Sequence, residues 1–249
     1  MIRIDGKTIQ PGEITEYPSG SGENAIISVM EESRAEYSYN TAGQLKFELL
    51  LRAETVAAAQ ELNRSGLNFA VFRDTTCNSV YWNRTPDGGF RLKDGVSPSK
   101  AIRDIFQNGS SYGTECATAM VIVFYGALLH LYGEKRFDEL FPNIFLMNWK
   151  KVDKRLRGID WMEKRADYFP GDRRYFMNPD VSPLTPQWQG ENVIDLNGTQ
   201  YYGHGVGILG ANAVIRALNA NRDEDAGESA YLMDAAGRPD YKSLSKLME

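Results

Sequence analysis

The chain has 249 residues, of which 42% are hydrophobic and 24% are charged, and its formal net charge is −5 with a pI near 5.3. A chain of this length can bury a substantial core, and its composition is that of a folded globular protein. The acidic balance and the even spread of Lys and Arg along the chain disfavour nucleic acid as a partner.

The cysteine and histidine content excludes two further classes. Cys77 and Cys116 are the only cysteines, which is too few for a disulfide scaffold. The two histidines, His130 and His204, complete no zinc-binding spacing with them, so we expect no metal and no cofactor.

Export and membrane signals are also missing from the sequence pattern. The N-terminal segment lacks the apolar region of a signal peptide, so synthesis in the cytoplasm is expected. The apolar run that follows Cys116 is shorter than the ~20 residues that cross a bilayer. We therefore expect no membrane partner.

The first quarter of the chain predicts a small hairpin and two helices. Asp5-Gly6 is a type I′ turn signal, which predicts a hairpin over Ile2–Ile9. A helix is expected at Asn24–Glu32. A longer packing helix should begin near residue 40 or 41 and end at Gly66, because apolar residues recur at helical spacing between these points.

Short strands and one helix are predicted between residues 69 and 107. The strands are Phe69–Arg73, Ser79–Asn83 and Phe90–Lys93, each rich in aromatic or β-branched residues or bounded by turn residues. The helix Ala101–Gln107 follows the start signal Ser97–Lys100.

The fold is expected to be organised around Thr114–Leu131, whose sequence is TECATAMVIVFYGALLHL. Its apolar residues cover every side of a helix, so this helix should be central and buried all round. Thr114 is the expected N-cap, which places Cys116 in the first turn, where the helix dipole favours a thiolate. Cys116 is therefore a candidate nucleophile, although an isolated cysteine beside apolar residues is more commonly an inert core residue.

The C-terminal half contains less regular chain. Glu134–Leu140 adds a helical turn or two, Asn143–Trp149 is a predicted buried strand, and Lys150–Gln189 is aromatic-rich and irregular, as expected of a wall or cover. The remaining elements are a hairpin at Glu191–Ile208, a helix at Ala211–Asn221, a strand at Ala230–Met233 and a helix at Tyr241–Met248. No repeat or linker is visible, so we expect one α+β domain over residues 1–249.

The hairpin supplies partners for the cysteine. Asn197-Gly198 predicts a two-residue type I′ turn, in which Leu196 pairs with Thr199 and Glu191 faces His204. Directly opposed residues have Cβ atoms about 4.5–5.5 Å apart, so the carboxylate and the imidazole should be neighbours. The glycines on both sides of His204 are expected to leave room around its ring.

Cysteine catalysis needs a thiolate-forming cysteine, a proton acceptor and a group that orients the acceptor. Cys116, Glu191 and His204 supply this set. A cysteine-headed helix packed on an antiparallel sheet also resembles the papain-like arrangement. Glu115 is a second candidate base, or else a surface residue that stabilises the helix dipole.

Several motifs, in order and in spacing, resemble the spore-coat protein-glutamine γ-glutamyltransferases of bacilli, and together they extend over nearly the whole chain. They are FELLLR..TVAAA (Phe47–Ala59), SKAIRDI…NG..Y..ECATA (Ser99–Ala119), the Asn148-Trp149 pair, QW.GENVI (Gln187–Ile194), Y..HG.GIL (Tyr201–Leu209) and SAYL (Ser229–Leu232).

The resemblance implies a single transglutaminase domain with a papain-like core of the NlpC/P60 type and a calcium-independent reaction. It makes Cys116 the nucleophile and places Glu191 where related papain-like enzymes have their histidine, with His204 completing the site. Trp149 and Trp188 would line the substrate passage. The family often has an acidic residue where this chain has Asn148.

In the implied reaction, Cys116 attacks a protein glutamine, ammonia leaves, and a protein lysine converts the thioester into an ε-(γ-glutamyl)lysine bond. The implied partners are proteins that carry Gln and Lys, namely spore coat proteins, and the implied location is the spore surface. Glu191 is expected to transfer the protons, with Glu115 in reserve and His204 as the base if the family's permuted order does not hold.

Two alternatives remain open on the sequence. The same residues would serve a cysteine hydrolase, a peptidase or amidase in which water takes the acyl group. A catalytically inert structural coat protein is the other alternative, although a scaffold would not need the set of Cys116, Glu191 and His204. The sequence does not fix which coat proteins are substrates or the oligomeric state.

Overall fold

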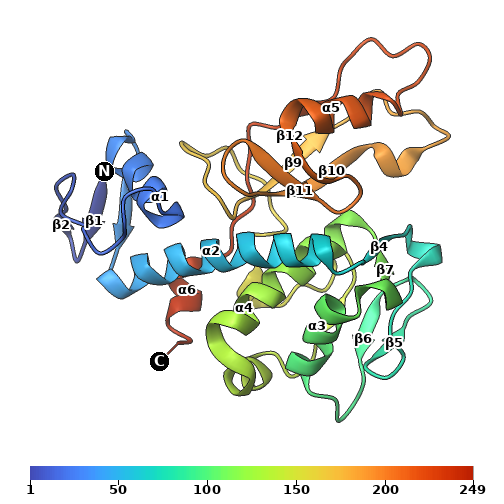
Figure 1. The fold of residues 1–249 in the computed structure, drawn as a ribbon, viewed down its shortest axis with the longest axis horizontal. Coiled ribbons are helices and arrows are strands. Elements are labelled where there is room, and N and C mark those ends of the chain that lie inside the picture. The colour runs from blue at the N-terminus through green and yellow to red at the C-terminus, as the bar shows by residue number, and fades with distance from the viewer. Residues whose placement is uncertain (249) are drawn as a thin grey trace.

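Two long helices form the centre of the computed structural model, which describes residues 1–248 (Figure 1). Helix α2 (Ala42–Arg64) runs along the molecule, and α4 (Cys116–Leu140) packs beside it. Helix α3 (Pro98–Gln107) packs against α4, and α6 (Tyr241–Ser245) packs against α2. The arrangement is mixed helix and sheet, as expected.

The N-terminal layer begins with the predicted hairpin. Strands β1 (Ile2–Ile4) and β2 (Lys7–Thr8) join β3 (Tyr37–Tyr39) in a sheet of order β2-β1-β3, and α1 (Gly22–Glu32) follows β2. Asp5 and Gly6 have φ values of 51° and 71°, as a type I′ turn requires. The hairpin prediction is confirmed.

Helix α2 begins and ends where its capping residues predict. The side chain of Thr41 accepts a hydrogen bond from the backbone N–H of Gln44, which caps the first turn. Gly66 follows the last turn with φ +83°, the left-handed conformation that glycine adopts most easily.

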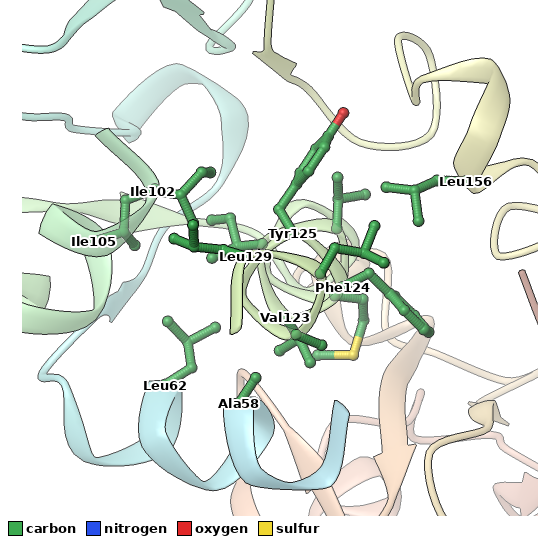
Figure 2. Close-up of a cluster of buried hydrophobic side chains, with 14 of the residues drawn as sticks. Ala58, Leu62, Ile102, Ile105, Val123, Phe124, Tyr125, Leu129 and Leu156 are labelled. Atoms are coloured by element: carbon green, nitrogen blue, oxygen red, sulfur yellow. The ribbon is translucent and has the colours of Figure 1, made fainter. Parts of the chain in front are cut away.

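Helix α4 is buried on all sides over most of its length. Figure 2 shows Val123, Phe124, Tyr125 and Leu129 pointing outward from its axis in different directions, toward side chains of α2 and α3 and toward Leu156. The helix reaches Leu140, passing through Gly133, whose φ of 72° is not helical. At 25 residues it is long and apolar enough to cross a membrane, so the length argument made from the sequence is wrong, but 72% of its most apolar window is buried inside the protein.

The main sheet is antiparallel, with strand order β12-β11-β10-β9-β13. Its β10 contacts α4, and α5 packs across one face of the sheet, where Val214 and Leu218 cluster with Phe176, Val193 and Tyr201. The bounds, in sheet order, are β12 Gly207–Gly210, β11 Gln200–Gly203, β10 Gly190–Asp195, β9 Arg173–Met177 and β13 Tyr231–Leu232, with α5 at Ala211–Asn219.

Strand β9 corrects the interpretation of Lys150–Gln189 as irregular chain. It lies between β10 and β13 within the sheet. Its sequence, RRYFM, has two arginines whose burial the sequence pattern does not reveal, since an alternating strand normally keeps charged residues outside.

Two smaller sheets complete the fold. Strands β5 (Trp82–Arg84), β6 (Phe90–Leu92) and β8 (Phe145–Leu146) form one, and β4 (Asn68–Phe69) pairs in parallel with β7 (Gly113–Thr114) in the other. Of the strand predicted at Phe69–Arg73, only Phe69 lies in a strand, because Phe72–Asp74 forms a 3-10 helix, and the strand predicted at Asn143–Trp149 is two residues long as formed. The β4–β7 pair leads directly into α4, so it positions the cysteine.

Candidate active site

A cavity of about 600 Å³ opens at the start of α4. Cys116 lies in its wall, among residues of β4, β9 and β10 and of the loops that contain Val71, Trp149, Asp160 and Gln187. The lining comprises Phe69, Val71, Phe72, Glu115, Cys116, Ala117, Asn148, Trp149, Asp160, Met162, Arg173, Tyr175, Pro186, Gln187, Gln189, Gly190 and Asn192.

The cap of α4 differs from the prediction. Glu115, not Thr114, is the N-cap, and Cys116 is the first helical residue. The carboxylate of Glu115 accepts hydrogen bonds from the N–H groups of Ala117 at 2.5 Å and Thr118 at 2.9 Å, and from the Thr118 hydroxyl. The Glu115 carboxylate thus accepts the bonds that the Thr114 hydroxyl was predicted to accept, and the helix dipole favours its negative charge.

The thiol of Cys116 is not the activated thiolate that its helix position predicts. Burial raises its pKa to about 12, and the charges of Glu191 and Glu115 contribute to this rise. The side-chain N–H of Asn192, whose Nδ2 lies 3.4 Å from Sγ, acts in the opposite direction. Desolvation of a thiolate outweighs the dipole of one helix end, which is worth about 0.3–1 kcal/mol.

Glu191 is the buried carboxyl group best suited to act as a base. It is 2% exposed, and the backbone N–H of Gly205 donates to its Oε1 at 3.0 Å. Burial raises its pKa to about 7, and the charge of Glu115 adds to this, whereas the backbone hydrogen bonds from Gly205 and His204 lower it. A carboxyl group with this pKa is half ionised near neutral pH, which suits proton transfer in both directions.

The hairpin register is one residue away from the prediction. Asp195 pairs with Tyr201 and Val193 with Gly203, because the loop contains three residues, Asn197, Gly198 and Thr199. The Asp195 side chain accepts from the N–H groups of the first two loop residues, and the Asn197 side chain accepts from those of Thr199 and Gln200. These side-chain bonds stabilise the longer loop over the type I′ turn.

His204 consequently does not face Glu191. It lies in the turn between β11 and β12, and its Nε2 is 3.0 Å from the carbonyl oxygen of Asn68. The glycines beside it make room for the carboxylate rather than the imidazole, since a Cβ on Gly203 would lie 2.8 Å from Glu191 Cγ. The predicted carboxylate–imidazole pair is therefore wrong, and only the backbone N–H of His204 contacts Glu191.

Glu115 stands near the sulfur but is occupied by its capping bonds. It is mostly buried, and burial raises its pKa. It lines the cavity beside Cys116. It is thus a structural cap with a charge close enough to influence both the thiol and Glu191.

The two predicted tryptophans occupy different places. Trp149 lines the cavity, with the Arg173 guanidinium 4.5 Å from its ring centroid. Trp188 stacks on Phe69 with centroids 6.4 Å apart, and its neighbours Gln187 and Gln189 line the cavity. Asn148, at φ 49°, accepts a hydrogen bond from the Trp149 N–H through its own side chain.

Sequence reasoning missed Asn192, Arg173, Phe69 and Asp160 as cavity residues. Asn192 is the residue after Glu191, and a strand sends adjacent side chains to opposite faces. The assignment of Glu191 to the site therefore argued against Asn192, although both residues belong to the same motif. Arg173 had no comparable signal, because its strand was not predicted.

Comparisons with known proteins decide the family. The family model for protein-glutamine gamma-glutamyltransferases matches residues 1–248. The protein-glutamine gamma-glutamyltransferase of Bacillus mycoides is 44% identical over 247 residues, 99% of this chain and 88% of the relative. A Bacillus cereus protein of the same name is 44% identical over 246 residues, 98% of this chain and 88% of that one.

The chain belongs to the protein-glutamine gamma-glutamyltransferase family. Its fold is similar to that of a transglutaminase from Geobacillus stearothermophilus without its C-terminal extension, with a TM-score of 0.78 and 46% identity over 83% of this chain and 98% of the other. The enzyme is therefore a transglutaminase that cross-links proteins, and its substrates are protein Gln and Lys side chains.

Proposed function

We propose that this transglutaminase works through a thioester on Cys116, with Glu191 as the group that transfers protons. The observation that carries the proposal is a partly buried thiol in the cavity wall whose pKa is raised by the charge of Glu191, a buried carboxyl group with a pKa of about 7 that is not itself among the residues lining the cavity. The charge of Glu191 acts on the thiol directly, as one of the causes that raise the thiol's pKa.

The first half-reaction forms the thioester. The Glu191 carboxylate takes the proton of the Cys116 thiol, so the thiolate faces a neutral acid and the repulsion between the two charges disappears. The thiolate attacks the γ-carboxamide carbon of a protein glutamine. Glu191 then returns its proton to the leaving nitrogen, and ammonia departs.

The second half-reaction transfers the acyl group. A neutral lysine amine attacks the thioester carbonyl carbon, and Glu191 takes a proton from the attacking nitrogen. The C–S bond breaks, Glu191 protonates the sulfur, and the ε-(γ-glutamyl)lysine bond is complete. The apolar walls, with Trp149 and Phe69 among them, lower the amine's pKa and keep water from the thioester.

The fold class and the cellular location complete the proposal. We place the enzyme in one domain with a papain-like core, because the family match spans residues 1–248 and α4 begins with Cys116 and contacts β10 of an antiparallel sheet. We further propose that it acts on coat proteins at the spore surface. The motifs shared with spore-coat enzymes of bacilli support this location, which imaging of the tagged chain in sporulating cells tests.

A cross-linking assay tests the thioester. The wild type and Cys77→Ala, which removes the other free thiol, should form isopeptide bonds between a glutamine-bearing and a lysine-rich protein. Cys116→Ala should form none, and intact-mass measurement without lysine should find the acyl group on Cys116. Equal cross-linking by Cys116→Ala would falsify the proposal. Glutamate release unchanged by added lysine would favour the hydrolase instead.

A further inference from the structure

The cavity wall contains a buried cation that the proposed mechanism does not use. Arg173 of β9 is 3% exposed and lines the cavity beside Trp149. Within the described residues 1–248, its Nε has no hydrogen-bond acceptor. Burial lowers the pKa of its guanidinium to about 10, although the charge of Asp160 raises it. Within residues 1–248, no carboxylate forms a salt bridge with this guanidinium. A buried cation without such a partner is costly, so a role at the site would explain its place there.

One guanidinium nitrogen of Arg173 determines which way the amide of Asn192 points. Its Nη1 donates to Asn192 Oδ1 at 2.5 Å. A guanidinium has only donors, so the amide must present its oxygen to Arg173. The amide nitrogen is then directed to Cys116, with Nδ2 3.4 Å from Sγ.

We propose that Arg173 is a positioning residue of the active site, which holds the oxygen of the Asn192 amide and so keeps an N–H group directed at the Cys116 sulfur. This inference rests on the proposed role of Cys116 as nucleophile. It adds a residue on β9 that neither touches the sulfur nor exchanges a proton.

The consequence for the nucleophile is electrostatic. An N–H group directed at the sulfur stabilises the thiolate, and so does a nearby positive charge. Without Arg173, the amide is free to turn round and offer its oxygen to the thiol hydrogen, which stabilises the neutral thiol instead. Loss of Arg173 therefore hinders the step in which Glu191 takes the thiol proton.

Arg174 offers a matched control on the same strand. It is also buried, but it points to the other face of β9, where its guanidinium donates to the carbonyl oxygens of Ala235 and Met233. Arg174→Met makes the same substitution at the other buried arginine of β9 and leaves Arg173 and Asn192 in place.

The test follows the titration of the Cys116 thiol directly. Its rate of alkylation by iodoacetamide is measured at about pH 7–9, well below the thiol pKa of about 12, by mass spectrometry of the Cys116 peptide, so that Cys77 does not interfere. In this range the rate is proportional to the thiolate fraction, so a titration that moves up by about 1 pH unit is read as a roughly tenfold lower rate. In Arg173→Met the titration should move up by about 1 pH unit and kcat should fall about tenfold or more. Arg173→Lys should restore part of both, and Arg174→Met should move neither.

A double-mutant cycle separates positioning from a general structural role. If Arg173 acts through Asn192, adding Arg173→Met to Asn192→Ala should lower kcat and move the thiol titration little further than Asn192→Ala alone. Additive losses, or an unmoved thiol titration in Arg173→Met, would overturn the inference. If Arg173→Met does not fold, Asn192→Ala decides, because it must show the same upward movement of the titration. Wild-type cross-linking and Cys116→Ala test the proposed function separately.

Discussion

The imidazole of His204 is bound to the backbone carbonyl of Asn68, with 3.0 Å between Nε2 and the oxygen. A carbonyl only accepts, so Nε2 carries the hydrogen and the other ring nitrogen faces the Tyr202 hydroxyl at 3.4 Å. Burial lowers the pKa of His204, which keeps the ring neutral. This histidine ties the turn between β11 and β12 to β4, the strand that contributes Phe69 to the cavity.

His204→Gln should therefore retain most of the cross-linking activity. The glutamine amide can donate to the Asn68 carbonyl as Nε2 does, whereas loss of a general base costs about 10²–10⁴-fold. Initial rates of isopeptide formation, compared with those of Glu191→Gln, measure the difference. If both variants lose activity to the same extent, His204 acts as a base and Glu191 is not the sole proton-transfer group.

The helices could be predicted from the sequence because their signals are local. Thr41 and Gly66 cap α2, and Ser97 caps α3, through contacts a few residues away. Strand β9 and the hairpin register could not be predicted in the same way. Burial of Arg173 and Arg174 depends on partners distant in sequence, and the register depends on which side chains stabilise the loop at Asn197.

The candidate site shows the same division. Cys116 and Glu191 follow from a helix start and a strand motif, but the side chain that contacts the sulfur is that of Asn192. Because the predicted register was wrong by one residue, the space beside the glycines was assigned to the His204 ring, whereas the Glu191 side chain occupies it. Local patterns thus located the segments that carry the proposed reacting groups, whereas long-range packing determined which atoms meet.

The pH dependence of cross-linking should reflect Glu191. Its pKa of about 7 means that the carboxylate, the form that accepts the thiol proton, is lost as the pH falls below 7. The rate at limiting substrate should therefore rise through pH 7 and fall about tenfold per pH unit well below it. His204→Gln should leave this limb in place, because the pKa of His204 is lowered from its ordinary value. A limb that disappears in His204→Gln would contradict the assignment.

Glu191→Gln should be inactive yet more stable than the wild type at alkaline pH. The folded-state pKa of Glu191 is raised from 4.5 to about 7, so folding favours its protonated form. The wild type then loses stability between about pH 4.5 and 7, by up to roughly 3 kcal/mol. A neutral glutamine escapes this loss and can still accept from the Gly205 N–H.

Urea denaturation at pH 5 and pH 8 measures this effect. The free energy of unfolding of Glu191→Gln relative to the wild type should be higher at pH 8 than at pH 5. Asp195, whose pKa burial also raises, to about 6, contributes the same dependence to both proteins and cancels in the comparison. An equal difference at the two pH values would mean that Glu191 is not held near neutrality.

Gly203→Ala should displace the Glu191 carboxylate and lower the activity while the protein still folds. The added Cβ would lie 2.8 Å from Glu191 Cγ and 2.8 Å from Val206 Cγ2, closer than real Cβ contacts allow, so the Glu191 side chain must shift. Since a proton acceptor has to be within hydrogen-bond reach, kcat should fall about tenfold or more. Gly227→Ala, where an added Cβ meets nothing within 4 Å, is the matched control and should keep full activity. Wild-type kcat in Gly203→Ala, with folding confirmed by circular dichroism, would show that the position of this carboxylate does not limit the reaction.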